Sequence, residues 1–166
     1  MPIKDLLLPE FDQELRKART LLERVPDTLD KHDFKPHERS MPLAKLAAHT
    51  AQMPGFLTII LSTPEFDLAK SGVKPLVMQS RAQLLATFDK LSADAHALLE
   101  ETTDRAMHET WNLSANGHAI YNGSRYFAIR TMFFNHLIHH RAQLGVYLRL
   151  NDIPVPATYG PSADEQ

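Results

Sequence analysis

Four stretches of this chain repeat apolar residues at spacings of three and four, the pattern of a helix that buries one face. They are predicted to be helices over residues 9–25, 41–61, 76–102 and 124–150. The intervening residues 26–40 and 62–75 are polar and rich in proline and are predicted to be loops. The length of 166 residues suits one domain with one core. The pattern therefore predicts an all-α fold, an up-and-down four-helix bundle, in a single domain over residues 1–166.

Serine and proline residues mark where these helices should begin and bend. Ser40 and Ser124 are expected N-caps, and Pro9 is expected in the first turn of the first helix. Pro54 lies inside the second helix and has no N–H to donate to the carbonyl four residues back, so it predicts a bend. The bend would fall one turn after His49 and widen the bundle beside that side chain.

The segment between the third and fourth helices has a different character. Two short pieces with extended patterns flank Asn116 and Gly117, and Asn-Gly is the strongest short-range signal for a hairpin turn. We therefore expect a short irregular or hairpin segment within residues 104–123.

Charge and composition exclude several classes of protein. The formal net charge is −2 with histidine neutral, whereas a nucleic-acid binder usually has a basic surplus. No run approaches the ~18 apolar residues of a membrane span, and the first residues lack the apolar core of a signal peptide. The absence of cysteine excludes disulfides and thiolate ligands and fits a reducing compartment. We expect a cytoplasmic protein with no nucleic-acid or membrane partner.

Three histidines fall on apolar helix faces. His136 and His140 are four residues apart, so their rings lie one turn apart on the same face. His49 occupies a core-facing position in the second helix. A buried imidazole needs a polar partner, and three imidazoles on converging faces can share one cation. The alternative is that each is an ordinary core histidine with its own hydrogen-bond partner.

Three neutral imidazoles suit zinc, nickel, iron or a similar divalent ion. Structural zinc sites usually have four protein ligands, so three histidines with an open position are typical of a catalytic or ligand-binding site. An ion there would lower the pKa of a bound water toward ~7 and would deprotonate a bound thiol. The chain has no His-Glu-x-x-His motif, so a metalloprotease is unsupported.

Polar residues around the histidine pair have several possible roles. His139 could serve as a ligand three residues after His136, but it is expected to face a neighbouring helix or solvent. Gln143 shares the face of His140 and could orient a ligand, or it could be an ordinary polar residue at the end of the bundle. Arg141 could guide an anionic substrate, although an exposed charge is the simpler expectation. The other histidines are expected at the surface: His32, His37, His96, His108 and His118.

Three parts of the chain resemble the DinB-like family. They are LAAH with QMPGF at 46–56, NHLIHHRAQL with YLRL at 135–150, and IPVP with YGPSADE at 153–165. The similarity in length and in the order of elements covers nearly the whole chain. Any one of these motifs alone is unspecific, whereas their combination is specific to the family.

The resemblance implies a four-helix bundle, often a homodimer, that holds a divalent metal ion through His49, His136 and His140. Members of the family include thiol-dependent enzymes such as mycothiol-dependent maleylpyruvate isomerase and bacillithiol transferases. The implied function is that of a metal-dependent enzyme, a transferase or hydrolase, whose partner is a low-molecular-weight thiol or another small molecule. The alternative is a non-catalytic metal-binding helical module with a structural or sensing role.

Overall fold

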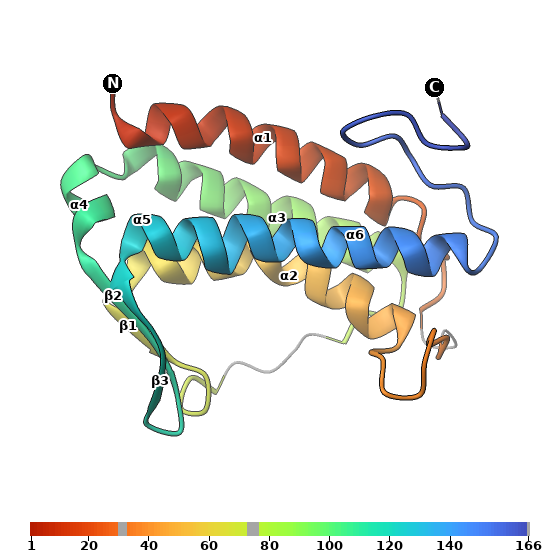
Figure 1. Cartoon of the computed structure of the whole chain (residues 1–166), viewed down its shortest axis with the longest axis horizontal. Coiled ribbons are helices and arrows are strands. Elements are labelled where there is room, and N and C mark those ends of the chain that lie inside the picture. The colour runs from red at the N-terminus through yellow and green to blue at the C-terminus, as the bar shows by residue number, and fades with distance from the viewer. Residues whose placement is uncertain (30–32, 73–76, 166) are drawn as a thin grey trace.

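The computed structural model describes residues 1–29, 33–72 and 77–165, so the predicted positions of His32 and Leu76 lie outside it. Four long helical segments form the body of the molecule (Figure 1). They are α1 (Ile3–Leu22), α2 (Leu43–Ser62), α3 (Arg81–Glu101) and a continuous helix made of α5 (Arg125–Ala128), the π-helical η1 (Ile129–Phe134) and α6 (Asn135–Arg149). None of the helices in these described ranges is long and apolar enough to cross a membrane.

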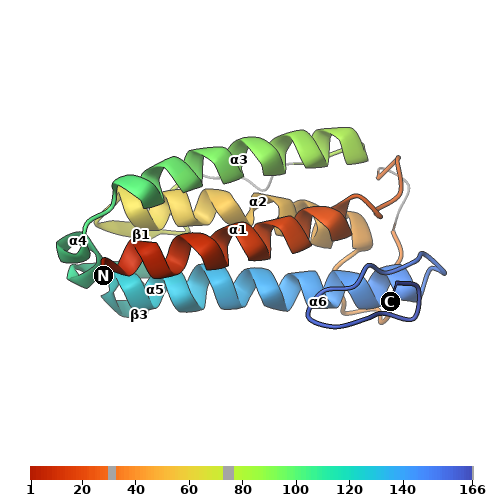
Figure 2. The ribbon, with the colours of Figure 1, turned by 90° about the horizontal axis from the view of Figure 1, so that it is seen from above.

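The four helices do not alternate in direction, so the predicted up-and-down order was wrong. The start of α1 lies beside the end of α3, where the ammonium of Lys4 donates to the carbonyl of Glu100. The start of α3 lies beside the end of α1, where the Arg81 N–H donates to the carbonyl of Asp27 at 3.0 Å. In Figures 1 and 2, α1 and α6 run one way along the bundle, and α2 and α3 both run the other way.

The length of the connection between α2 and α3 permits this order. α2 ends at Ser62 and α3 begins at Arg81 at the other end of the bundle, so residues 63–80, 18 in number, connect them. A connection of that length reaches about 60 Å when extended, whereas α3 is about 30 Å long at 1.5 Å per residue. A hydrophobic pattern shows which face of a helix is buried but carries no information about the helix's direction.

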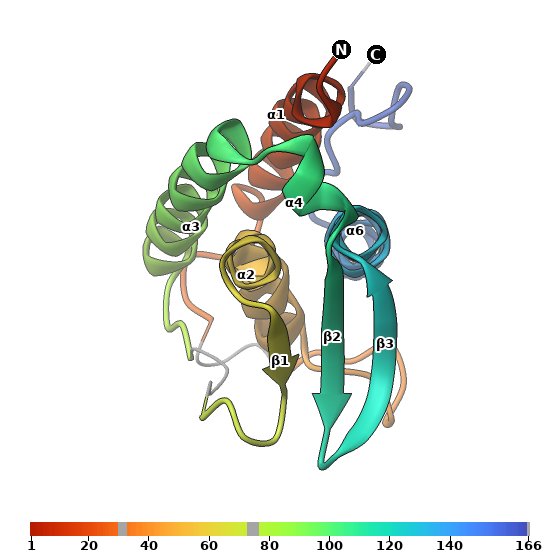
Figure 3. The same ribbon diagram turned by 90° about the vertical axis from the view of Figure 1, so that its left-hand side faces the viewer.

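α2 lies at the centre of the bundle, between α3 and α6 (Figure 3). A Cβ added to Gly55 would lie 3.3 Å from Cδ2 of Leu91, so α3 approaches α2 closely at this glycine. The orange N-terminal part of α2 is inclined to the rest of the helix in Figure 1, as the position of Pro54 predicts. The buried residues of α2 lie on more than one face of the helix: Leu43, Leu46, Ala47, Ala48, Thr50, Ala51, Met53, Pro54, Leu57 and Ile60.

α1 begins earlier than predicted. Its first residue is Ile3, so Pro9 lies inside the helix and not in its first turn. Leu7 is buried, and the backbone N–H of Ile3 donates to the carboxylate of Asp104 at 2.8 Å. These tertiary contacts stabilise the two turns before the proline, which the local signal at Pro9 could not reveal.

The predicted N-cap of α2 was also wrong. The helix begins at Leu43 with Pro42 at the N-cap position. Ser40 belongs instead to a preceding turn, in which its backbone N–H donates to the carbonyl of His37 at 2.9 Å.

Serine caps do begin the two later helices. The hydroxyl of Ser80 accepts from the Gln83 N–H at 3.2 Å, so α3 starts at Arg81, later than predicted. The hydroxyl of Ser124 accepts from the Phe127 N–H at 3.3 Å, which confirms the predicted start of the last helix.

A small three-stranded sheet at one end of the bundle shows that the fold is mostly helical but not purely all-α (Figure 3). After a short helix, α4 (Asp104–His108), strands β2 (Thr110–Ala115) and β3 (His118–Ser124) form the expected hairpin. Its turn residues Asn116 and Gly117 have φ values of 51° and 79°, as a type I′ turn requires.

The third strand of the sheet lies in a segment that was predicted to be a loop. β1 (Glu65–Asp67) pairs in parallel with β2. Three residues are too few to show the alternation of a strand, so only its pairing identifies it. The buried Trp111 of β2 packs against Phe56 of α2, with ring centroids 6.1 Å apart, and so holds the sheet on the bundle.

Arg125 joins the sheet end of the bundle to the last helix. Its side chain is buried, and its guanidinium donates to the carbonyls of Ile60, of Thr63 at 2.8 Å and of Ala106 at 3.3 Å. Ile60 and Ala106 lie in the last turns of α2 and α4, where backbone carbonyls have no partner within the helix. Arg125 therefore satisfies carbonyls in two separate segments, the end of α2 and α4.

Replacing Arg125 with methionine should lower the free energy of unfolding by about 3 kcal/mol, because buried carbonyls lose their donor. Urea denaturation followed by circular dichroism measures the change. Arg125→Lys should recover part of the loss, and Arg105→Met, at an exposed position on α4, should change stability by less than about 0.5 kcal/mol. Equal stability of the Arg125→Met and Arg105→Met proteins would show that the buried guanidinium is dispensable.

Candidate metal centre

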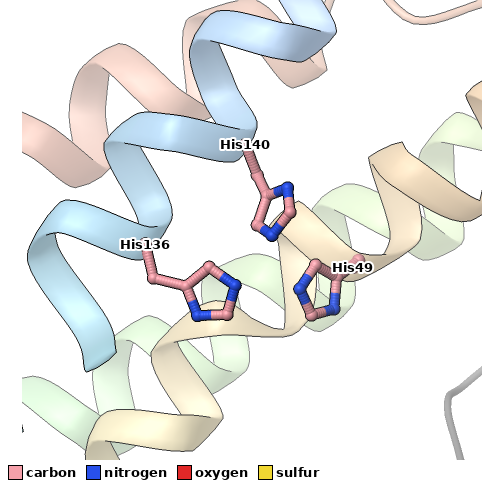
Figure 4. Close-up of side chains that lie close together, drawn as sticks. All are labelled: His49, His136 and His140. Atoms are coloured by element: carbon pink, nitrogen blue, oxygen red, sulfur yellow. The ribbon is translucent and has the colours of Figure 1, made fainter. Parts of the chain in front are cut away.

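His49 of α2 faces His136 and His140 of α6 (Figure 4). Each residue offers a ring nitrogen, and these nitrogens all lie within 4.8 Å of one another. The centroid of the His49 ring is 5.4 Å from that of His136 and 4.5 Å from that of His140, and the His136 and His140 centroids are 4.6 Å apart. The three residues singled out in the sequence therefore form one half-buried cluster, called the histidine cluster below.

A π-helical turn precedes the histidine pair. At the end of η1 the backbone N–H of Asn135 donates to the carbonyl of Arg130, five residues back. In an α-helix the acceptor would be four residues back. The carbonyl of Met132 in this turn accepts a hydrogen bond from the ring of His136. π-helical turns occur frequently at functional sites. This one supplies a partner that fixes the His136 ring while its second nitrogen stays available to the cluster.

A side-chain amide fixes the ring of His140. Nδ1 of His140 lies 2.9 Å from Oε1 of Gln143, one turn later on α6. Because an amide oxygen only accepts, Nδ1 is the protonated nitrogen and Nε2 keeps its lone pair. Gln143 thus orients a cluster residue, the first of the two roles considered for it.

Burial keeps the three imidazoles neutral. Burial, followed by the influence of His140, His136 and Lys45, lowers the pKa of His49 to about 4. Burial also lowers the pKa values of His136 and His140, against the opposing effect of the hydrogen bond that each ring makes. A histidine must be unprotonated to bind a metal ion, so all three rings are in the ligating form at neutral pH.

The remaining histidines lie outside the cluster. His139 is exposed, with its ring centroid 4.9 Å from that of His140. His96 was expected at the surface but lies on α3, half-buried, with its ring centroid 5.8 Å from that of Phe11. The expected surface positions are confirmed for His37, His108 and His118.

Arg141 is buried, so the expectation of an exposed charge was wrong. Its side chain is 3% exposed and forms an ion pair with Glu14 of α1, at 2.7 Å between Nη1 and Oε2. The hydroxyl of Tyr159 accepts from Arg141 at 2.6 Å and donates to Glu14 at 2.6 Å. Successive helix residues point about 100° apart, so the residue after His140 faces α1 and not the cluster. Arg141 holds α6 to α1 and to the C-terminal tail, and it does not face a substrate at the cluster.

Acid should destabilise the metal-free protein through these rings. The folded pKa of His49 is about 4, whereas an unfolded histidine titrates near ~6.5, so the unfolded state binds more protons between these values. The stabilisation is fully present above pH ~6.5 and is lost as the pH falls toward the folded value. Between pH 7 and pH 4.5 we expect His49→Gln to lose about 2 kcal/mol less unfolding free energy than the unmodified protein.

Urea denaturation across this pH range, with a chelator present, measures the difference. His37→Gln, at an exposed position, should keep the pH dependence of the unmodified protein. Identical pH dependence in the unmodified and His49→Gln proteins would contradict the lowered pKa.

Comparison with known proteins identifies relatives along the whole chain. The chain is similar to the uncharacterized protein YrdA of Bacillus subtilis (strain 168), with 26% identity over 164 residues that cover 97% of this chain and 90% of YrdA. Its structure is similar to that of a DinB-like protein from Bacillus cereus ATCC 10987, with a TM-score of 0.67 and 18% identity over 95% of this chain and 98% of that chain.

A second solved structure has a similar fold. The DinB-like protein YjoA of Bacillus subtilis matches with a TM-score of 0.65 and 18% identity, over 97% of this chain and 99% of that chain. At this identity the two structures establish the fold alone. The model of the DinB family matches residues 1–166, the full length of the sequence. The chain therefore belongs to the DinB family.

Proposed function

We propose that this protein binds one divalent transition-metal ion through His49, His136 and His140. The observation that carries the proposal is the convergence of three unprotonated rings from two helices, with nitrogens within 4.8 Å of one another. Ligand nitrogens around a tetrahedral zinc ion lie about 3.4 Å apart, given Zn–N bonds of ~2.1 Å. A bound ion would draw the three ring nitrogens toward that spacing.

The donor set fits a borderline ion such as zinc, nickel or iron, since imidazole suits all three. The hydrogen bond from His140 to Gln143 supports the fit, because metal-binding histidines usually donate their other ring N–H to a fixed acceptor. Among the described residues no fourth histidine or carboxylate joins the three. Three ligands leave a coordination position for a small molecule.

We further propose that the protein is a metal-dependent enzyme, a transferase or hydrolase, with a low-molecular-weight thiol as the leading candidate substrate. A divalent ion would lower the pKa of a water or thiol in its open position. The half-buried position of the cluster supports this proposal, because solvent-sized molecules can reach rings that are not enclosed. The chain's own contribution would be to fix the rings of His136 and His140, through the carbonyl of Met132 and the amide of Gln143.

A non-catalytic metal-binding module is the second candidate. The observation in its favour is that the three rings come from two helices, with His49 on α2 and the other two on α6. An ion held in this way would stabilise the contact between α2 and α6 as a structural zinc site does.

Protein produced without an affinity tag should bind about one equivalent of zinc or nickel and should unfold at a higher temperature when loaded, because the ion binds the folded state. At a free ion concentration of 100 times Kd the gain is about 2.7 kcal/mol. His49→Ala and His140→Ala should each lose most of this gain, whereas exposed His37→Ala should keep it. Elemental analysis, calorimetry and thermal unfolding measure these effects. Full ion content in His49→Ala would contradict the proposed ligand set.

The enzymatic and structural proposals differ in the response to thiols. If the protein is a thiol transferase, the loaded form should consume a thiol in the presence of an electrophilic acceptor, and chelation or His140→Ala should lower the rate at least about 100-fold. If the ion is structural, its removal should lower thermal stability while no thiol competes for the open position. Loss of free thiol, measured across a panel of thiols and acceptors, decides between them. Inactivity across the whole panel would exclude the transferase proposal and leave the metal site standing.

A further inference from the structure

A lysine stands one turn from the histidine cluster. Lys45 precedes His49 by four residues on α2, so the two side chains lie on the same face of that helix. Lys45 is exposed, and its ammonium takes part in no ion pair within residues 1–29, 33–72 and 77–165. It is therefore a cation one helical turn from the cluster that pairs with no described carboxylate.

A positive charge lies near the cluster. The pKa of His49 is lowered first by burial and then by His140, His136 and Lys45, so the lysine lies close enough for its charge to act on the ring. No carboxylate is among the groups that shift the pKa values of the three cluster residues, for the part of the chain that the structure describes. No carboxylate of the described residues joins the three ring nitrogens in the cluster.

This arrangement selects the charge of a ligand. Three neutral imidazoles leave the charge of a divalent ion uncompensated, unlike thiolate ligands, which neutralise it. An ammonium one turn away adds to the same positive potential, and such a potential attracts anions and disfavours cations. Among small molecules that reach the open position, those with a negative group directed toward Lys45 should therefore bind best.

We propose that Lys45 and the histidine cluster together form the binding site of a small organic anion, with one donor atom at the cluster and a carboxylate or phosphate at Nζ of Lys45. The proposal rests on the proposed metal site and names the class of ligand that the site takes. Residues four apart on a helix are separated by about 6 Å along its axis, a distance that a chain of three or four carbon atoms spans. Lys45 then determines specificity, while the histidines hold the ion.

Two thiols of similar size test the proposal with cobalt-loaded protein, in which visible absorption reports binding at the ion. 3-Mercaptopropionate carries a carboxylate, and 2-mercaptoethanol carries a neutral hydroxyl. Lys45→Gln should weaken binding of 3-mercaptopropionate about fivefold and change that of 2-mercaptoethanol by less than about twofold. The difference should shrink in 0.5 M salt, because exposed charges are screened. Comparing each thiol with itself across variants cancels the difference between the thiol pKa values.

Two matched variants control for nonspecific effects. Lys90→Gln removes the same charge from an exposed site on α3 and should leave both affinities unchanged. Lys45→Arg keeps the charge and should keep the preference for the carboxylate. Circular dichroism and the cobalt content of each variant establish that it is folded and loaded.

The outcomes separate this inference from the metal site. If cobalt binds but Lys45→Gln weakens both thiols equally, or neither, the anion site is wrong and the metal site stands. Failure of both thiols to perturb the cobalt spectrum would also overturn the anion site. Unmodified protein that binds no cobalt would overturn both proposals.

Discussion

The burial of α2 on several faces is the constraint on which the rest of the structure depends. With α3 on one side and α6 on the other, this helix has little surface left for solvent (Figure 3). Gly55 lets α3 approach closely, and Phe56 holds the sheet through Trp111. His49 is a half-buried polar residue on this mainly apolar helix, so it needs partners on a neighbouring element. The packing of α2 against α6 places its ring beside those of His136 and His140, where a shared cation would be that partner.

The adjacent residues His140 and Arg141 illustrate two ways of burying a polar group. Arg141 keeps its charge and is fully compensated, since Glu14 neutralises it and the hydroxyl of Tyr159 completes the hydrogen bonds. This network holds α1, α6 and the tail together. The histidine cluster loses its charge instead, through lowered pKa values. It keeps unshared electron pairs directed at a common space, and this property makes it a candidate site.

Sequence patterns predicted the features that depend on one helix face or one turn. The apolar periodicity located the long helices and the cluster residues His49, His136 and His140, and Asn116-Gly117 located the hairpin. The features that were missed depend on contacts between distant segments. The shared direction of α2 and α3, the strand β1 and the burial of Arg141 follow from tertiary pairing. A local pattern contains no record of such pairing, since the same apolar stripe fits either helix direction.

The half-buried position of the cluster reconciles two opposing requirements of a metal site. Fully exposed rings would titrate near ~6.5, so protons would compete with an ion close to neutral pH. Fully buried rings would exclude any small molecule from the ion. At an intermediate depth the pKa of His49 falls to about 4, while the exposed residues Lys45 and His139 still lie next to the cluster. Desolvation from the bundle and access from solvent therefore act on the same three rings. Because no carboxylate of the described residues joins the three rings, the site favours ligands that bring a negative charge with them.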